Sequence, residues 1–227
     1  MCMKYTKPYL APTLTVDLVL FQVINSRLHV LLINRPHDPF RGHWALPGGY
    51  VPAGETTLEA LTRICEAKAS IDTGKLTFLK QFTANDSIAR DPRGHAVAMI
   101  YLGIVDKMSL SKSPDETAFF PIDDLPDNLA FDHVNTIYQA RDFLRDELNH
   151  TTIANAFLPP LFTFTELLTV YEAIFSREFD RRNFYTIFMR RGVLVETDKL
   201  YHHPTSRPAK LYKFNSTKVV PFSNSLD

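Results

Sequence analysis

The sequence predicts an α/β protein in two parts, an N-terminal α/β sandwich of residues 1–150 and a smaller C-terminal unit of residues 161–227. In the first part, strand patterns interleave with two amphipathic helix patterns; in the second, two helix patterns precede two short strand patterns. Hydrophobic residues make up 45% of the 227 residues and charged residues 22%, a balance that excludes a disordered chain.

The elements of the N-terminal part follow from hydrophobic spacing and from the position of turn residues. Two runs rich in β-forming residues, separated by a short polar turn, predict an opening hairpin. Apolar residues at helical spacing predict two helices, of which the first has Thr56 and Thr57 as candidate caps. The expected strands are 14–21, 28–33, a short one at 44–49, 76–82, 97–105 and one that begins at 119, and the expected helices are 56–68 and 130–148.

The C-terminal part has a different character. A Thr pair, an Asn and a Pro-Pro step predict that residues 151–160 form a linker. Two helices are then expected at 165–175 and 180–191, with Gly192 as the residue that ends the second. Strands at 193–195 and 210–214 bracket a basic loop, residues 197–209. Two helices followed by a two-stranded wing are the layout of a winged helix-turn-helix.

Cysteine usage and hydropathy bear on the compartment. Cys2 and Cys65 are too few for a disulfide framework, so both are interpreted as free thiols in a reducing compartment. No apolar run is long enough to span a bilayer, and the polar N-terminus does not resemble a secretory signal. We therefore expect a cytoplasmic protein without a membrane partner.

A strand–loop–helix signature resembles that of the Nudix hydrolases. Gly49 is followed after five residues by Glu55 and after seven more by Arg63, behind the lead-in Trp-Ala-Leu-Pro-Gly-Gly of residues 44–49. The resemblance implies a Nudix-like α/β/α sandwich. The second half of the signature departs from the family: Ile64, the pair Ala67-Lys68 and Ser70 stand in place of a Glu, a Glu pair and a Gly.

These departures bear on catalysis. Pyrophosphate cleavage in this family needs a divalent cation held by carboxylate oxygens, and Ala67 and Lys68 supply none. We therefore predict no hydrolase activity, no metal site and no cofactor, and expect Glu55 and Arg63 to remain as a structural ion pair. A functional hydrolase that uses Glu55, Glu59 and Glu66 as unconventional ligands is the alternative.

A pocket can persist where catalysis is lost. The Nudix-like fold binds nucleoside diphosphates linked to a second group, and an Arg suits a phosphate. We predict an effector site at Arg35, Phe40, Arg41, Trp44, Gly48 and Gly49. Alternatively, Trp44 belongs to the core and Phe40 anchors its loop.

The C-terminal unit is a candidate DNA-binding surface. Although the whole chain has no net charge, ten basic and four acidic residues lie between Arg177 and Lys218. An exposed recognition helix and a basic wing would contact the grooves and the phosphates of a DNA duplex. The predicted contact residues are Thr165, Arg181, Arg182, Tyr185, Thr186, Met189, Arg190, Arg207 and Lys210. Cations that face only water are the alternative.

The two parts together resemble the NrtR-type, Nudix-related transcriptional regulators from about residue 13 to residue 214. The segments that carry the resemblance are Asp91-Pro-Arg-Gly94, Leu129-Ala-Phe-Asp-His133, residues 161–167, residues 170–174, Asp180-Arg-Arg-Asn-Phe184 and residues 207–212. The resemblance implies a homodimeric repressor or activator, a repressor in our prediction, that binds an operator in double-stranded DNA and senses a small metabolite such as ADP-ribose. A pentose-responsive regulator of the same architecture, an active hydrolase of a nucleotide sugar, and an adaptor for an acidic protein are the alternatives.

Overall fold

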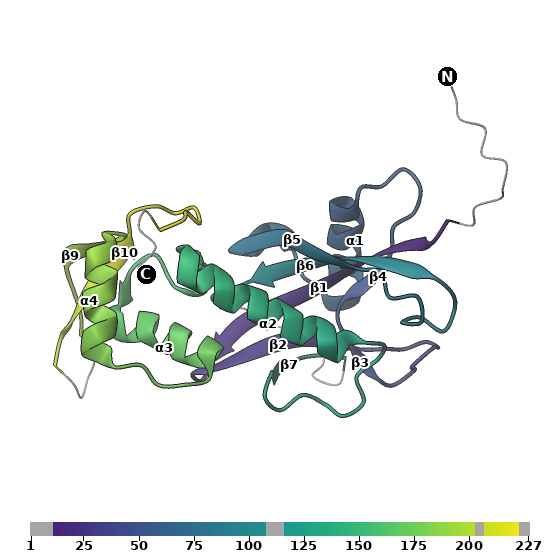
Figure 1. The fold of residues 1–227 in the computed structure, drawn as a ribbon, viewed down its shortest axis with the longest axis horizontal. Coiled ribbons are helices and arrows are strands. Elements are labelled where there is room, and N and C mark those ends of the chain that lie inside the picture. Colours follow the sequence, from purple (N-terminus) through teal and green to yellow (C-terminus); the bar gives the residue numbers. More distant parts are fainter. Residues whose placement is uncertain (1–10, 108–115, 203–206, 223–227) are drawn as a thin grey trace, which may run out of the picture.

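The computed structural model describes residues 11–107, 116–202 and 207–222. The molecule is elongated, with a large twisted sheet at one end and a small helical unit with its own short strands at the other (Figure 1). Helix α2 runs along the molecule between the two ends (Figure 1). The α/β class and the C-terminal winged helix-turn-helix predicted from the sequence are both present.

The large sheet has seven strands and is built around β1. Strands β3, β2, β1, β6 and β5 lie in this order, while β4 pairs with β1 and β7 pairs with β2. Strand β1 is parallel to β6 and antiparallel to β2 and β4. The bounds are β1 Thr13–Ile24, β2 Arg27–Asn34, β3 Trp44–Ala45, β4 Gly48–Tyr50, β5 Phe78–Asn85, β6 Ala96–Ile104 and β7 Thr117–Pro121.

Helices cover both faces of this sheet. Helix α1 (Thr57–Ala69) begins at Thr56, whose side chain forms a capping box with Glu59, and α2 (His133–His150) lies on the other face. Because side chains alternate along a strand, β1 serves both layers: Leu18 and Leu20 join the cluster under α1, whereas Val19 and Phe21 join the cluster under α2. The predicted α/β/α sandwich is confirmed. A short 3₁₀ helix, η1 (Thr73–Lys75), follows α1.

Residues 151–160, the predicted linker, are largely buried. They contain a 3₁₀ helix, η2 (Ile153–Phe157), in which Ile153 and Ala154 are fully buried. The Thr152 amide donates to the carbonyl of Val220, so the end of the described chain is bound to this segment. Apolar residues in this stretch outweigh its turn residues, because they complete the core between the two ends of the molecule.

The C-terminal unit contains two helices and a three-stranded sheet in the order β8, β10, β9. Its elements are β8 Phe162–Thr163, α3 Phe164–Phe175, α4 Arg181–Arg191, β9 Leu194–Tyr201 and β10 Ala209–Phe214. Gly192 ends α4 in the left-handed conformation, as predicted. The expected loop of 197–209 is too long, because β9 continues to Tyr201; residues 203–206 lie outside the described residues.

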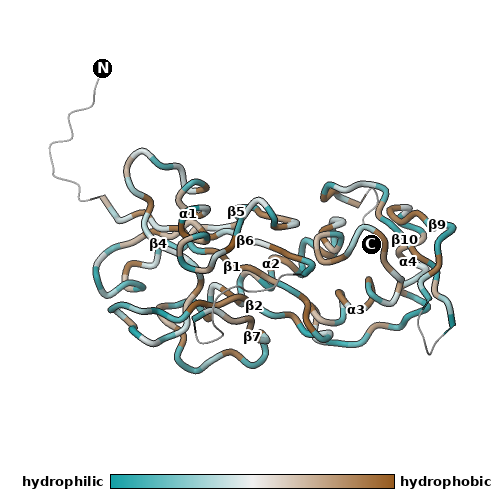
Figure 2. Tube along the Cα trace, turned by 180° about the vertical axis from the view of Figure 1, so that it is seen from behind, coloured by the Kyte–Doolittle hydropathy of each residue, from teal (hydrophilic) through white to brown (hydrophobic). Residues whose placement is uncertain are grey.

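A single hydrophobic cluster joins the two ends. It extends from β1 and α2 through η2 to α3, α4 and β10. Hydrophobic residues are concentrated in the central strands, and hydrophilic residues in the outer loops (Figure 2). Burial raises the pKa of the Cys65 thiol, in α1, to about 12, so this thiol is unreactive at neutral pH. Cys2 lies outside the described residues, and no helix among the described ranges could cross a membrane.

Candidate functional site

A cavity of about 800 Å³ opens beside the sheet, next to α1. Its volume is in the usual range for ligand sites. The lining residues come from β1, the end of β2, β4, α1, the start of α2 and the loops that adjoin these elements, β6 and β7. Its acidic, basic and histidine lining residues are Asp17, Arg35, His37, Asp38, Glu55, Arg63, Lys68, Arg90, Asp91, Arg93, Glu116 and His133.

Half of the predicted effector residues line this cavity. Arg35, Gly48 and Gly49 are lining residues, whereas Phe40, Arg41 and Trp44 are not. The ring of Trp44 packs edge-on against Phe120 and joins the core, which is the alternative that the sequence left open. Phe40 packs on Phe131 and His43 in its own loop, and Arg41 is exposed to solvent. The prediction that Phe40, Arg41 and Trp44 line the cavity is therefore wrong.

Gly48 is required by a close approach between β4 and β1. A Cβ atom at this position would lie 1.9 Å from Oδ1 of Asp17 and 2.7 Å from the carbonyl oxygen of Val16. The absence of a side chain thus lets the Asp17 carboxylate lie against the backbone of β4 and face the cavity. The Gly-Gly step of the signature therefore has a packing reason here.

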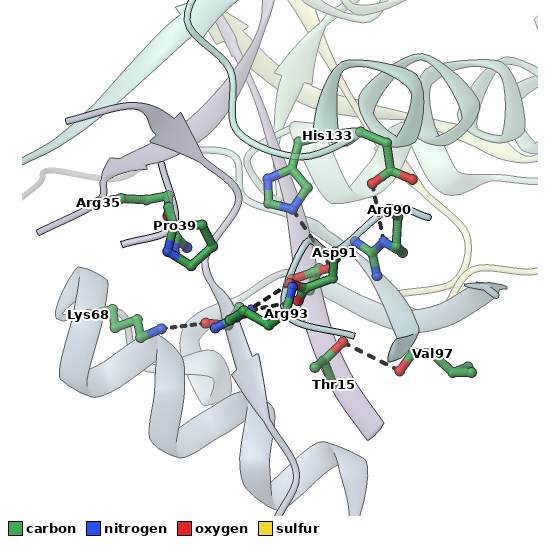
Figure 3. Close-up of polar contacts among 12 residues, drawn as sticks. Thr15, Arg35, Pro39, Lys68, Arg90, Asp91, Arg93, Val97 and His133 are labelled. Atoms are coloured by element: carbon green, nitrogen blue, oxygen red, sulfur yellow. Dashed lines mark hydrogen bonds and ion pairs between the residues drawn. The ribbon is translucent and has the colours of Figure 1, made fainter. Parts of the chain in front are cut away.

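Arg90 forms a buried network that the sequence did not reveal. Its guanidinium lies 3.2 Å from Oδ2 of Asp17 and 3.2 Å from Oδ1 of Asp132, with only 5% of the side chain exposed. Asn85 donates a second hydrogen bond to Asp132, over 2.7 Å. The network connects β1, the segment before β6 and the residue that precedes α2, as Figure 3 shows for Arg90.

His133, the first residue of α2, closes one side of the cavity. The ring is almost completely buried, and its Nε2 lies 3.9 Å from Oδ2 of Asp17 (Figure 3). Burial, the largest cause, lowers the pKa of His133, and Arg90 lowers it further, while Asp17 opposes the shift. His133 is therefore neutral at physiological pH.

Two arginines and two aromatic rings form the outer part of the cavity. The Arg35 guanidinium lies 4.8 Å from the centre of the Phe131 ring, and that of Arg93 lies 5.2 Å from the ring of Tyr50. Burial, followed by repulsion from Arg93, lowers the pKa of Arg35. Arg93 also forms an ion pair of 2.6 Å with Asp91. Planar cations beside aromatic faces suit both phosphate groups and flat rings as ligands.

The carboxylates of the Nudix-like signature have other partners. Glu55 accepts hydrogen bonds from Nε and Nη2 of Arg63, the shorter of 2.8 Å, so the predicted ion pair between loop and helix is present. Glu59 accepts the amide of Thr56 at the start of α1. Among the described residues, no cluster of three or more His, Cys, Asp or Glu side chains has the geometry of a metal site.

Helix α4 presents the candidate DNA-binding face. Its buried side is held by Phe184 and Phe188, which pack on Tyr171 of α3. Its other side is open: the exposed residues on α4 are Arg181, Arg182, Asn183, Tyr185, Met189 and Arg190. Thr165, at the start of α3, accepts a hydrogen bond of 3.0 Å from Arg181. The hydroxyl of Thr186 donates to the carbonyl of Arg182 on its own helix.

The wing, which we define as β9, β10 and their connection, is less cationic than the sequence suggested. Lys210 forms an ion pair of 2.6 Å with Glu196, and the hydroxyl of Tyr185 lies 3.4 Å from the same carboxylate. Arg207, the first residue of the described range 207–222, is exposed. The structure thus brings Tyr185 and Lys210 together through Glu196, a residue that the sequence analysis did not single out.

Two family models match the chain, each over one end. Residues 13–140 match the NUDIX domain, and residues 154–214 match the NrtR DNA-binding winged helix domain. The chain belongs to the NrtR family. The resemblance predicted from the sequence is therefore confirmed.

Known members share the architecture of this NrtR-family chain along most of its length. It is 31% identical to the ADPR responsive transcriptional repressor NtrR of Acinetobacter baylyi over 212 residues, which is 91% of this chain and 83% of the relative. The crystal structure of Shewanella oneidensis NrtR with a 27mer DNA has a TM-score of 0.76 and 28% identity, and the match covers 89% of this chain and 93% of that one.

The NUDIX part has both ligand-binding and enzymatic relatives. The NUDIX domain of the Shewanella protein, solved with ADP ribose, is 30% identical with a TM-score of 0.54, over 63% of this chain and 94% of that one. The ADP-ribose pyrophosphatase of Methanocaldococcus jannaschii is 34% identical over 145 residues, which is 63% of this chain and 79% of the enzyme.

Proposed function

We propose that this NrtR-family chain is a homodimeric transcriptional repressor of the cytoplasm that binds double-stranded DNA. ADP-ribose, bound in the cavity beside α1, changes its affinity for DNA without being hydrolysed. The observation that carries this function is that the cationic cavity and the exposed face of α4 are joined through one helix, α2, which contacts both the cavity and the winged helix.

The cavity suits a ligand with a diphosphate and flat rings. Arg35 and Lys68 line it and form no ion pair with a carboxylate within the described ranges. Phosphate oxygens would satisfy these cations, while the ring of Phe131 offers a stacking face. ADP-ribose carries both groups, the Acinetobacter relative is an ADPR responsive repressor, and the NUDIX domain of the Shewanella relative was solved with ADP ribose. A free pentose would leave the cations without anionic partners.

The site favours binding without hydrolysis. A divalent cation needs several oxygen ligands, and Arg63 and Thr56 already hold the carboxylates of Glu55 and Glu59. Lys68 places a positive charge on the same helix face. These residues do not fit a metal, so the pyrophosphatase activity of the enzymatic relative is not proposed for this chain.

The DNA-binding role is supported by the open face of α4. Arg182, Tyr185 and Met189 lie at helical spacing on one side of it, where they could meet base edges in a major groove. Arg181 and Arg190 flank them and could contact phosphates on either strand. A two-fold dimer would present two such helices to a palindromic operator.

Helix α2 is the proposed connection between the two sites. Its first residue, His133, lines the cavity, and near its other end Nε of Arg145 donates to the carbonyl of Ile174, in α3, over 2.8 Å. The hydroxyl of Tyr171, also in α3, donates to the carbonyl of Leu148 over 2.9 Å. A ligand that moves the start of α2 would thus displace α3, on which α4 packs.

The test measures DNA affinity and ligand binding on the same full-length protein. A duplex is first selected by this protein from a random pool, and its affinity is then determined by fluorescence anisotropy with and without ADP-ribose. We expect ADP-ribose to raise the melting temperature of the protein and to change its affinity for the duplex. Bound ADP-ribose that leaves the DNA affinity unchanged would refute the coupling.

Two further measurements separate the alternatives. Incubation with ADP-ribose and Mg²⁺ should release no AMP; release at the rate of an ordinary enzyme would establish the hydrolase instead. A pentose that stabilises the protein when ADP-ribose does not would establish the sugar-responsive regulator.

A further inference from the structure

Lys68 lies where the Nudix signature expects a metal-binding carboxylate. It projects from α1 toward the turn of β4, and its Nζ donates a hydrogen bond of 2.6 Å to the carbonyl oxygen of Gly48 (Figure 3). A Cβ atom on Gly49 would lie 3.4 Å from the same Nζ. The ammonium group is therefore held against the backbone of the Gly-Gly step, and the residue lines the cavity.

This position conflicts with a divalent cation. The Gly48 carbonyl oxygen is the kind of ligand that Mg²⁺ or Mn²⁺ would use, but here it accepts a hydrogen bond from Lys68. A metal ion at this place would lie next to an ammonium group, and the preceding residue, Ala67, has no side-chain oxygen. The donor set of this cavity thus does not fit the metal that the hydrolase fold implies.

The charges around Lys68 favour an anion. Burial is the largest cause that lowers the pKa of Lys68. Repulsion from Arg35, Arg93 and Arg63 lowers it further, whereas the carboxylate of Asp17 raises it. Arg63 and Arg93 have carboxylate partners, Glu55 and Asp91. Lys68 and Arg35 form no such pair in the described part of the chain, so an incoming anion would relieve their mutual repulsion.

We propose that the Lys68 ammonium takes the place of the divalent cation, so that this cavity binds a diphosphate without metal. The proposal rests on the proposed function for the identity of the ligand, ADP-ribose. Lys68, anchored by the Gly48 carbonyl, contributes two remaining N–H donors to the diphosphate, and Arg35, which lines the same cavity, contacts it as well. A lysine cannot polarise a water molecule as a metal does, so binding is separated from hydrolysis.

The first experiment is calorimetric titration of the full chain with ADP-ribose, in EDTA and in millimolar Mg²⁺. We expect equal affinities in both buffers for the unaltered protein. Lys68→Met, which removes the charge and keeps the length, should weaken binding by about tenfold or more in both. Lys75→Met is the matched control, because Lys75 lies outside the cavity and is largely exposed. Affinity that depends on Mg²⁺, or that survives Lys68→Met, would overturn the proposal.

The second experiment uses Mn²⁺ alone and needs no knowledge of the organic ligand. Binding is followed by the loss of the free-ion signal in electron paramagnetic resonance. The unaltered protein should not bind Mn²⁺ at micromolar concentrations, whereas Lys68→Glu, which restores the carboxylate of the signature, should bind at least about tenfold more tightly. Tight Mn²⁺ binding by the unaltered protein would refute the role of Lys68. If ADP-ribose fails to bind under any condition, the proposed effector is wrong, and the Mn²⁺ titration still decides this inference.

Discussion

The backbone amide of Leu46 donates a hydrogen bond of 3.0 Å to Nδ1 of His133, which joins the segment before β4 to the first residue of α2. This bond requires an unprotonated Nδ1, so the ring cannot become an imidazolium without losing it. The same ring lines the cavity. The relationship therefore links the protonation state of one buried side chain to both the fold and the proposed effector site.

The first prediction concerns acid stability. Because the pKa of His133 is lowered in the folded protein, the unfolded chain takes up this proton first as the pH falls from about 6.5. The contribution of His133 to the free energy of unfolding is fully present above pH 6.5 and declines as the pH falls below that value. The melting temperature should fall across this window, and less steeply in His133→Asn, whose amide oxygen can accept the Leu46 amide. His150→Asn, at an exposed site, should keep the slope of the unaltered protein. Equal slopes in all three would contradict the prediction.

The second prediction concerns the approach of β4 to β1. Gly48→Ala should lower the free energy of unfolding by about 1–3 kcal/mol, because the new methyl group would overlap Asp17 and the backbone of Val16. Chemical denaturation measures this change. Gly49→Ala is the matched control: its nearest neighbours are Cδ1 of Ile64 at 3.1 Å and Nζ of Lys68 at 3.4 Å, the movable ends of flexible side chains. The prediction fails if both alanines cost the same.

The third prediction concerns transmission through α2. Arg145→Met should reduce the effect of ADP-ribose on DNA affinity, because it removes the hydrogen bond from α2 to the end of α3. We expect a stability cost of only about 1 kcal/mol. The measured quantity is the ratio of DNA dissociation constants with and without ADP-ribose. Arg141→Met, one turn earlier on α2 and paired with Asp142 on its own helix, should leave the ratio intact. An unchanged ratio in Arg145→Met would exclude this contact from the coupling.

The fourth prediction concerns the wing. Glu196→Gln should increase affinity for random duplex DNA, because it releases Lys210 from its ion pair. The slope of log affinity against log salt should become steeper by about one unit if Lys210 then contacts a phosphate. Asp198→Asn removes the same charge from an exposed site on β9 and is the control. Indistinguishable salt slopes in the two variants would show that Lys210 does not reach the DNA.

The sequence was informative wherever local patterns decide the structure. The cap at Thr56, the end of α4 at Gly192 and both helix faces of the winged unit follow from neighbouring residues, and the structure contains them. The burial of Ile153 and Phe157 within the predicted linker did not follow from the sequence, because it depends on elements distant in the sequence. Composition describes a segment by itself, whereas burial depends on what packs against it.

The site was predictable only where it coincides with a motif. The Gly-Gly step was found because it belongs to the strand–loop–helix signature, and Arg35 was found because an Arg in the preceding loop suits a phosphate. Arg90 and Asp132 were missed because 42 residues separate them in the sequence, and only the folded chain brings the segment before β6 to the start of α2. Trp44 was misassigned because an aromatic residue near a glycine turn suits a pocket or a core equally well, and Phe120 decides for the core.

The uninterrupted apolar cluster that runs from β1 to β10 has a consequence for engineering chimeric regulators. Neither end of the molecule has a polar surface where the two ends meet, because Ile153 and Phe157 belong to a hydrophobic core that both ends share. A graft of this ligand-responsive half onto an unrelated DNA-binding module must therefore retain residues 151–160 together with α3. A junction placed at residue 150 would expose a hydrophobic surface, and such a surface recruits chaperones or drives aggregation.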